Sequence, residues 1–153
     1  MSNILICYYS SAGNSKYQDL ADSLFGNGNN VLQWNINGTD NKQNNADRVI
    51  EFKPDLVFSY NNCLPKKLFL SLECPILIVD ADNPEMFWNK ELLKSNKKNI
   101  YYLGYQTESR QIYKKILDLD IPNQNYLFFP PASNFKSESK ILSTINISFI
   151  GFS

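Results

Sequence analysis

The sequence of 153 residues contains no histidine. This absence excludes the Ser-His-Asp and Cys-His nucleophile systems and the common histidine metal triads. Any acid–base chemistry must therefore come from carboxylates, lysine, tyrosine or cysteine. The chain also lacks an excess of charge of either sign, because 15 basic side chains balance 15 acidic ones. No strong field therefore favours binding to nucleic acid or to an anionic membrane surface.

Long apolar runs and regularly spaced cysteines are missing as well. No run approaches the roughly 20 apolar residues that a membrane-spanning helix needs, and the N-terminus does not resemble a signal peptide. The three cysteines, Cys7, Cys63 and Cys74, form no Cys-x-x-Cys pair, which argues against a zinc site and a disulfide framework. We therefore expect a cytoplasmic protein with buried thiols, no transmembrane segment, no bound metal and no nucleic-acid partner.

Aromatic residues, by contrast, are plentiful at 14% of the chain, and many tyrosine and asparagine residues fall in the expected loops. Aromatic rings stack on the apolar faces of sugars, and amide groups donate and accept hydrogen bonds. These residue types suit a neutral polar ligand such as a sugar.

Short, continuously apolar runs alternate with segments of helical periodicity. The runs predict strands at Ile4–Tyr9, Val31–Ile36, Asp55–Tyr60, Pro75–Val79, Asn99–Tyr105, Tyr126–Phe129 and Asn146–Phe152. Helices are predicted at Lys16–Phe25, Asn45–Lys53, Leu64–Leu72, Glu85–Ser95 and Thr107–Leu119. Strands that are apolar throughout are typical of a parallel sheet with both faces covered. The pattern predicts a doubly wound, Rossmann-like α/β domain with a mainly parallel sheet.

Ligands of such domains bind at the carboxyl ends of the strands, near the point where the strand order reverses. Four polar loops directly follow predicted strands: Ser10–Asn14, Tyr60–Asn62, Asp80–Pro84 and Pro130–Ser133. We expect the binding site to lie among these loops.

The first loop is open to two interpretations. Ser10, Ser11, Gly13 and Asn14 resemble the phosphate-binding loop of a flavodoxin, in which hydroxyl and backbone N–H groups bind the phosphate of FMN. Ala12, however, replaces a second hydroxyl of that loop. Serine, glycine and asparagine also make the tight turn that any doubly wound domain needs at this place. A flavodoxin-like electron carrier therefore remains an alternative, and a non-catalytic α/β binding module is a third one.

The second half of the chain resembles GT-B glycosyltransferases, and most closely the group of the spore-maturation-type enzymes. The segments that carry the resemblance occur in the family's order: PDLVFSYNN, CPILIVDADNPEMF, NIYYLGYQTESRQIYKKIL, YLFFPPASN and NISFIGFS. The resemblance implies that residues 1–145 are the acceptor-side N-terminal domain, and that residues 146–153 begin the connection to a C-terminal domain beyond the chain. That second domain binds most of the nucleotide-sugar in the family, so this fragment is expected to be inactive alone.

The resemblance also suggests roles for individual residues. The reaction would transfer a sugar from a nucleotide-sugar donor, a co-substrate rather than a cofactor, to a hydroxyl of a glycan or another acceptor. Asp82, and after it Asp80, are the candidates for the base, although an aspartate here can also simply cap a turn. The D-x-D pattern that they form is typical of metal-dependent GT-A enzymes, but the GT-B resemblance argues against a metal.

The expected substrate-binding residues lie in the loops after the strands. They are Ser10, Ser11, Gly13, Asn14, Tyr60, Asn61, Asn62 and Ser133. Phe87 and Trp88, which fall at helical spacing, are interpreted instead as core or inter-domain packing.

Overall fold

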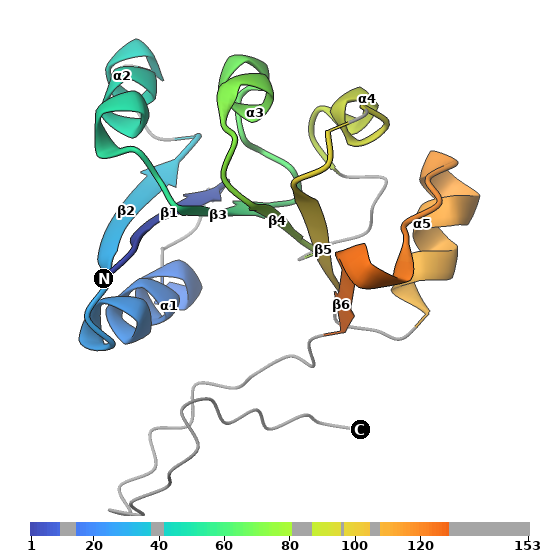
Figure 1. The fold of residues 1–153 in the computed structure, drawn as a ribbon, viewed down its shortest axis with the longest axis horizontal. Helices are drawn as coiled ribbons and strands as arrows, with labels where there is room; N and C mark the ends of the chain where they lie inside the picture. The colour runs from blue at the N-terminus through green and yellow to red at the C-terminus, as the bar shows by residue number, and fades with distance from the viewer. Residues whose placement is uncertain (10–14, 38–41, 81–86, 96, 105–107, 129–153) are drawn as a thin grey trace, which may run out of the picture.

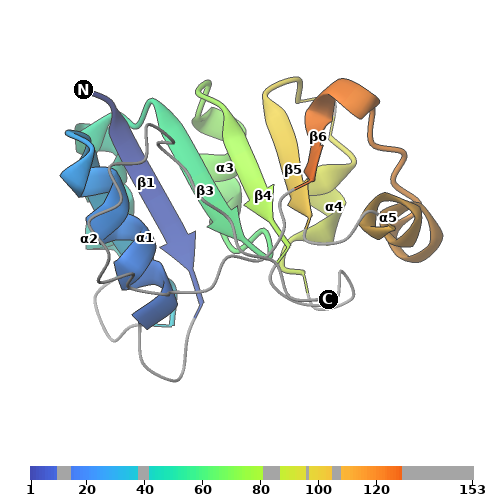
Figure 2. The same ribbon diagram turned by 90° about the horizontal axis from the view of Figure 1, so that it is seen from below.

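The computed structural model describes residues 1–9, 15–37, 42–80, 87–95, 97–104 and 108–128. Within these ranges the strands are β1 (Asn3–Tyr8), β2 (Asn30–Asn35), β3 (Leu56–Tyr60), β4 (Ile76–Val79), β5 (Ile100–Gly104) and β6 (Tyr126–Phe128). They form one sheet in the order β2-β1-β3-β4-β5-β6, and every neighbouring pair is parallel. Figure 2 shows the strands running the same way, so that their carboxyl ends share one edge.

Helices lie on both faces of the sheet, which confirms the predicted α/β class. The helices are α1 (Ser15–Gly26), α2 (Lys42–Phe52), α3 (Lys66–Ser71), α4 (Lys90–Leu93) and α5 (Ser109–Leu117), and a short 3-10 turn, Asn123–Asn125, precedes β6. In Figure 1, α2, α3 and α4 lie on one side of the sheet and α1 lies on the other.

The core is divided by the sheet because successive strand side chains point to opposite faces. The larger cluster contains Leu5, Cys7 and Ile78 from the strands, with buried side chains from α2, α3, α4 and α5. The smaller cluster contains Ile6, Tyr8 and Ala21 under α1. Because strands such as β1 are apolar at successive positions, they supply side chains to both layers of the core.

One predicted helix is too long. The sequence predicts a helix over Glu85–Ser95, but the described part of this segment is helical only in α4. Asn89 has a left-handed backbone with φ 45°, and its side-chain Nδ2 donates to the carbonyl of Leu64 at 3.2 Å. This hydrogen bond, together with those from the Asn62 side chain to the carbonyls of Trp88 and Asn89, holds the segment in a loop and overrides the helical periodicity.

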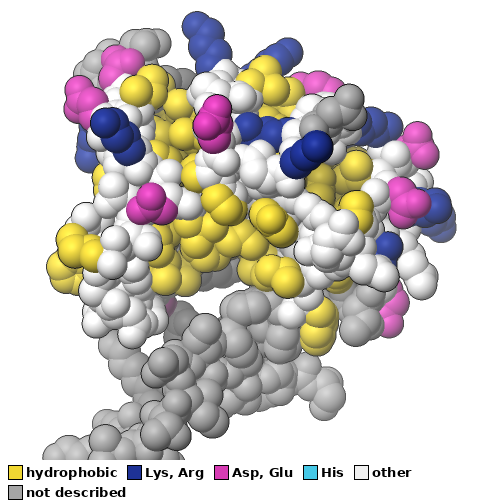
Figure 3. All heavy atoms as spheres, viewed as in Figure 1, with side chains coloured by type: hydrophobic (Ala, Val, Ile, Leu, Met, Phe, Trp, Pro, Cys, Tyr) yellow, Lys and Arg dark blue, Asp and Glu magenta, His cyan; other side chains and the backbone are white. Residues whose placement is uncertain are grey.

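Charged groups of both signs are interspersed on the helical surface. Figure 3 shows Lys and Arg side chains beside Asp and Glu side chains, with no large patch of either sign in this view. Among the described helices, none combines the length and hydropathy needed to cross a lipid bilayer.

Candidate functional site

The strand order reverses between β1 and β3. From β1 the chain moves to one side to form β2, and it then crosses back to form β3 and the strands beyond it. Ligands of doubly wound domains bind at the carboxyl edge of the sheet where the strand order reverses in this way. The side chains of Tyr8 and Tyr60 mark the ends of these two strands.

Tyrosine rings line the inner part of this edge. Tyr17 of α1 stacks on Tyr8 with ring centroids 4.1 Å apart, and it meets Tyr60 edge-on at 4.8 Å. Burial raises the pKa of the Tyr8 hydroxyl, and the neighbouring Cys7 adds a smaller effect. These three rings link β1, β3 and α1 and give the edge a rigid aromatic base.

A second aromatic pair lies farther out. The rings of Tyr9 and Trp88 have centroids 4.8 Å apart and planes tilted by 41°. Tyr9 is 42% exposed and Trp88 is 44% exposed, so both residues are accessible to solvent. Tyr9 directly follows β1, and Trp88 belongs to the connection between β4 and α4. The pair therefore forms an aromatic platform at the carboxyl edge.

Asparagine amides hold Trp88 in place. The Nδ2 atom of Asn62 donates to the carbonyls of Trp88 at 3.0 Å and of Asn89 at 3.1 Å. The backbone N–H of Trp88 donates to the carbonyl of Asn61 at 2.9 Å. Asn62 is fully buried and has φ 53°, a conformation that asparagine tolerates better than most residues. The loop after β3 thus fixes the backbone of Trp88, one of the two residues of the aromatic platform.

A buried carboxylate lies at the end of β4. Asp80 is only 8% exposed, and its N–H donates to the carbonyl of Leu103 in β5 at 3.0 Å. Burial, and after it the charge of Asp80, raises the pKa of Tyr113 well above its usual range. The Tyr113 hydroxyl is nevertheless without a hydrogen bond of regular geometry among the described residues. Asp80 and Tyr113 are thus electrostatic neighbours.

Tyr126 is the second tyrosine on which the charge of Asp80 acts. Burial raises the pKa of Tyr126, a hydrogen bond with Ser109 opposes that effect, and the charge of Asp80 adds to it. Ser109 begins α5 and is itself buried. The carboxylate of Asp80 therefore lies near two tyrosine hydroxyls, close enough for its charge to raise the pKa of both.

Gly104 leaves the space that Tyr126 occupies. A Cβ atom at position 104 would clash with the Tyr126 hydroxyl and would lie 2.9 Å from Cζ of that ring and 3.1 Å from Cβ of Ser109. We expect Gly104→Ala to displace the Tyr126 ring and to lower the free energy of unfolding by about 2 kcal/mol. Gly26→Ala is the matched control, because nothing lies within 4 Å of a Cβ there. Urea unfolding of both variants tests this, and equal stabilities would contradict the packing described.

Stability should fall at alkaline pH because of the buried tyrosines. Burial raises the pKa of Tyr102 and Tyr113 above the ordinary value of 10.0. Their stabilising effect is complete below that value and is lost as the pH rises above it, because the unfolded chain then ionises first. Each contributes a slope of up to about 1.4 kcal/mol per pH unit. Urea unfolding from pH 9 to 11 measures this slope, which should shrink in Tyr102→Phe; an unchanged slope would contradict it.

The structure brings several predicted site residues together. Tyr60, Asn61 and Asn62 lie beside the end of β4, because the N–H of Asn61 donates to the carbonyl of Val79 at 2.9 Å, next to Asp80. The side chain of Asn62, being fully buried, positions Trp88 and offers no exposed surface of its own. The other predicted residues lie outside the described residues: Ser10, Ser11, Gly13, Asn14, Asp82 and Ser133.

Sequence reasoning missed the aromatic platform. Phe87 is 3% exposed and lies in the core as expected, whereas Trp88 is 44% exposed and is not a core residue, and its expected role in inter-domain packing stays a prediction. The helical spacing that suggested packing does not apply, because this segment is a loop. Neither Tyr113 nor Tyr126 was singled out, since only the sheet topology brings them near Asp80.

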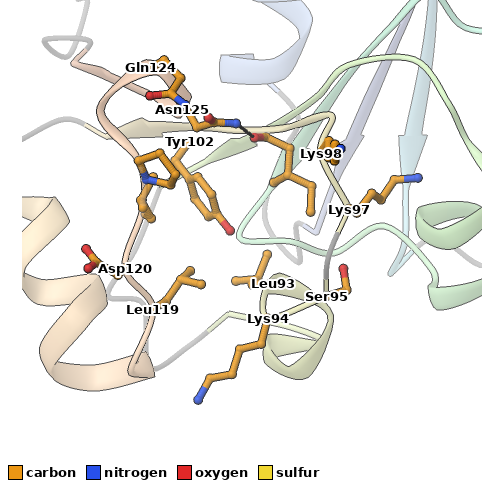
Figure 4. A pocket seen from close by; sticks show the side chains of 13 residues that line it. Leu93, Lys94, Ser95, Lys97, Lys98, Tyr102, Leu119, Asp120, Gln124 and Asn125 are labelled. Carbon is orange, nitrogen blue, oxygen red and sulfur yellow. Dashed lines mark hydrogen bonds between the residues drawn. The ribbon is translucent and has the colours of Figure 1, made fainter.

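A separate hollow lies toward the amino ends of the strands. It has a volume of about 470 Å³ and is bordered by Leu93, Ile100 and Leu119, with Tyr102 at its base. Figure 4 shows the Tyr102 side chain pointing into the space between α4 and the chain that follows α5. This hollow contains none of the predicted site residues.

No metal-binding cluster of three or more acidic or cysteine side chains occurs within the described ranges.

No family model, no curated protein and no solved structure shows significant similarity to this chain. The fold and the local chemistry are therefore the observations from which a function can be inferred.

Proposed function

We propose that this chain is the acceptor-side domain of a GT-B-type glycosyltransferase and that it binds a saccharide or another hydroxyl acceptor at its carboxyl edge. The observation that carries this proposal is the exposed Tyr9–Trp88 pair at that edge. Each exposed ring of the pair provides an apolar face that can stack on the C–H face of a sugar ring. The reversal of strand order between β1 and β3 supports the location.

Asp80 supports the chemical part of the proposal. In glycosyl transfer, a base accepts the proton of the acceptor hydroxyl as that oxygen attacks the anomeric carbon, and the nucleotide diphosphate leaves. With no histidine in the chain, a carboxylate is the natural base. Asp80 belongs to the same β4–α4 connection as Trp88, so a sugar on the platform and the carboxylate share one edge. Asp82 remains the other candidate.

The assay uses the two tryptophans of the chain. Trp34 is 4% exposed and Trp88 is 44% exposed, and Trp34→Phe leaves Trp88 as the only tryptophan reporter. We expect its emission to change on titration with neutral oligosaccharides that present β- or α-linked glucose, galactose or N-acetylglucosamine. A chain whose Trp88 emission responds to none of these saccharides would contradict the proposal.

A flavodoxin-like carrier is the second candidate, because a specific observation favours it. The order of the first five strands, β2-β1-β3-β4-β5, is the flavodoxin order, in which FMN binds at the β1/β3 reversal. Titration with FMN under the same conditions separates the candidates. Quenching of flavin fluorescence at a stoichiometry of one would favour the carrier, whereas the glycosyltransferase proposal predicts no quenching.

A further inference from the structure

Two cysteines lie in contact beneath the candidate site. The Sγ atoms of Cys7 in β1 and Cys63 in the loop after β3 are 3.5 Å apart. Cys7 is 0% exposed and Cys63 is 3% exposed, and both are free thiols. The third cysteine, Cys74, is partly exposed and precedes β4 at the opposite end of the sheet. The chain therefore contains one close thiol pair and one separate thiol.

We propose that Cys7 and Cys63 form a reversible disulfide when a small oxidant such as hydrogen peroxide reaches them, and that this bond regulates the aromatic platform. The regulatory part rests on the proposed function, whereas the formation of the bond does not. The pair is a modification site distinct from the carboxylate of Asp80 and from the platform itself.

The reaction consumes one peroxide and two thiols. The Cys63 thiolate attacks one peroxide oxygen, the O–O bond breaks, and the hydroxide that leaves takes up the thiol proton to give water. The Cys7 sulfur then attacks the sulfur of the resulting sulfenic acid and displaces its hydroxyl as a second water. The two sulfurs lose two electrons in total, and both oxygens of the peroxide are reduced.

The location of Cys63 lets the two sulfurs approach each other. A disulfide is about 2.05 Å long, so the sulfurs must move about 1.5 Å closer. Cys7 is fixed in the central strand β1, whereas Cys63 lies in a loop and must supply most of this movement. Cys63 directly follows Asn62, whose amide holds the carbonyls of Trp88 and Asn89. Bond formation therefore pulls on the loop that positions Trp88.

The rate of the reaction should depend on pH. Burial, with a smaller contribution from Cys63, raises the pKa of the Cys7 thiol. The Cys7 thiol is therefore protonated at neutral pH, and its attack on the sulfenic acid should accelerate as the pH rises, since the thiolate is the nucleophile.

Peptide mapping of the folded, peroxide-treated protein under non-reducing conditions tests the bond. We expect a Cys7–Cys63 linked peptide and an intact mass lower by about 2 Da, the mass of two hydrogens. Cys74→Ser should give the same product and Cys63→Ser should not. Peptide mapping of the chain without substitutions shows whether the Cys7–Cys63 disulfide forms, even if a variant fails to fold. Oxidation of Cys74 alone, or separate sulfinic acids at positions 7 and 63, would overturn the proposal.

Fluorescence of the Trp34→Phe chain tests the regulatory part. Oxidation should change the emission of Trp88, and dithiothreitol should reverse the change. A linked peptide without any change in Trp88 emission would overturn the coupling to the platform. Neither readout needs a sugar, so failure here is distinguishable from failure of the proposed function.

Discussion

Replacing Asn62 by aspartate should destabilise the domain more than any other single change considered. The substitution keeps the shape of the side chain but removes the two N–H groups that donate to the carbonyls of Trp88 and Asn89. A carboxylate oxygen would then face two carbonyl oxygens in a site that is 0% exposed. We expect a loss of about 3–5 kcal/mol in the free energy of unfolding.

Asn27→Asp is the matched control for this prediction. Its Nδ2 atom also donates to a backbone carbonyl, that of Ser23 at 2.9 Å, but the residue is exposed. Water can therefore hydrate the new carboxylate, and the cost should stay within about 0.5 kcal/mol. Urea unfolding at pH 7 compares the two variants. Similar stabilities would show that Asn62 does not hold the loop as described.

Removing the Trp88 ring should have the largest effect on ligand binding. Trp88→Ala deletes half of the platform that it forms with Tyr9, while the carbonyl that Asn62 binds belongs to the backbone and is retained. We expect a fall in saccharide affinity of at least tenfold, or about 1.4 kcal/mol. Isothermal titration calorimetry measures it without a tryptophan reporter.

Phe25→Ala controls for the loss of an exposed aromatic ring in general. Phe25 is 70% exposed and lies near the end of α1, away from the carboxyl edge. Its removal should leave the saccharide affinity unchanged. Equal losses in the two variants, or no loss in Trp88→Ala, would contradict a platform at Trp88.

The fold was predictable because its determinants are local in the sequence. Runs such as Ile76–Val79 are apolar at every position, which is typical of a strand covered on both faces, and the segments between them have helical periodicity. The expectation that the candidate site lies at the carboxyl edge then followed from the topology of this fold class. The predicted Tyr60–Asn62 loop and Asp80 are indeed neighbours there.

The loop conformation of Trp88 and the tyrosine neighbours of Asp80 could not be predicted, because they depend on contacts between residues far apart in the sequence. The loop conformation of Trp88 depends on hydrogen bonds from Asn62, which is 26 positions away. Likewise, the hydroxyls of Tyr113 and Tyr126 come near Asp80 through the packing of α5 and β6. Periodicity reports on neighbours along the chain, so it identified Trp88 as part of a helix and gave no sign of the hydroxyl groups around Asp80.

The most direct test of the account is to map where a saccharide binds by NMR. The chain is labelled with ¹⁵N and titrated with the oligosaccharide that changes Trp88 emission most. The account predicts that the shifted resonances cluster at the carboxyl edge, on Tyr9, Tyr60 and the indole N–H of Trp88, with those of Leu93 and Leu119 at the separate hollow unchanged. Shifts confined to that hollow would contradict the account. So would a result in which FMN shifts the resonances at the β1/β3 edge and no saccharide does.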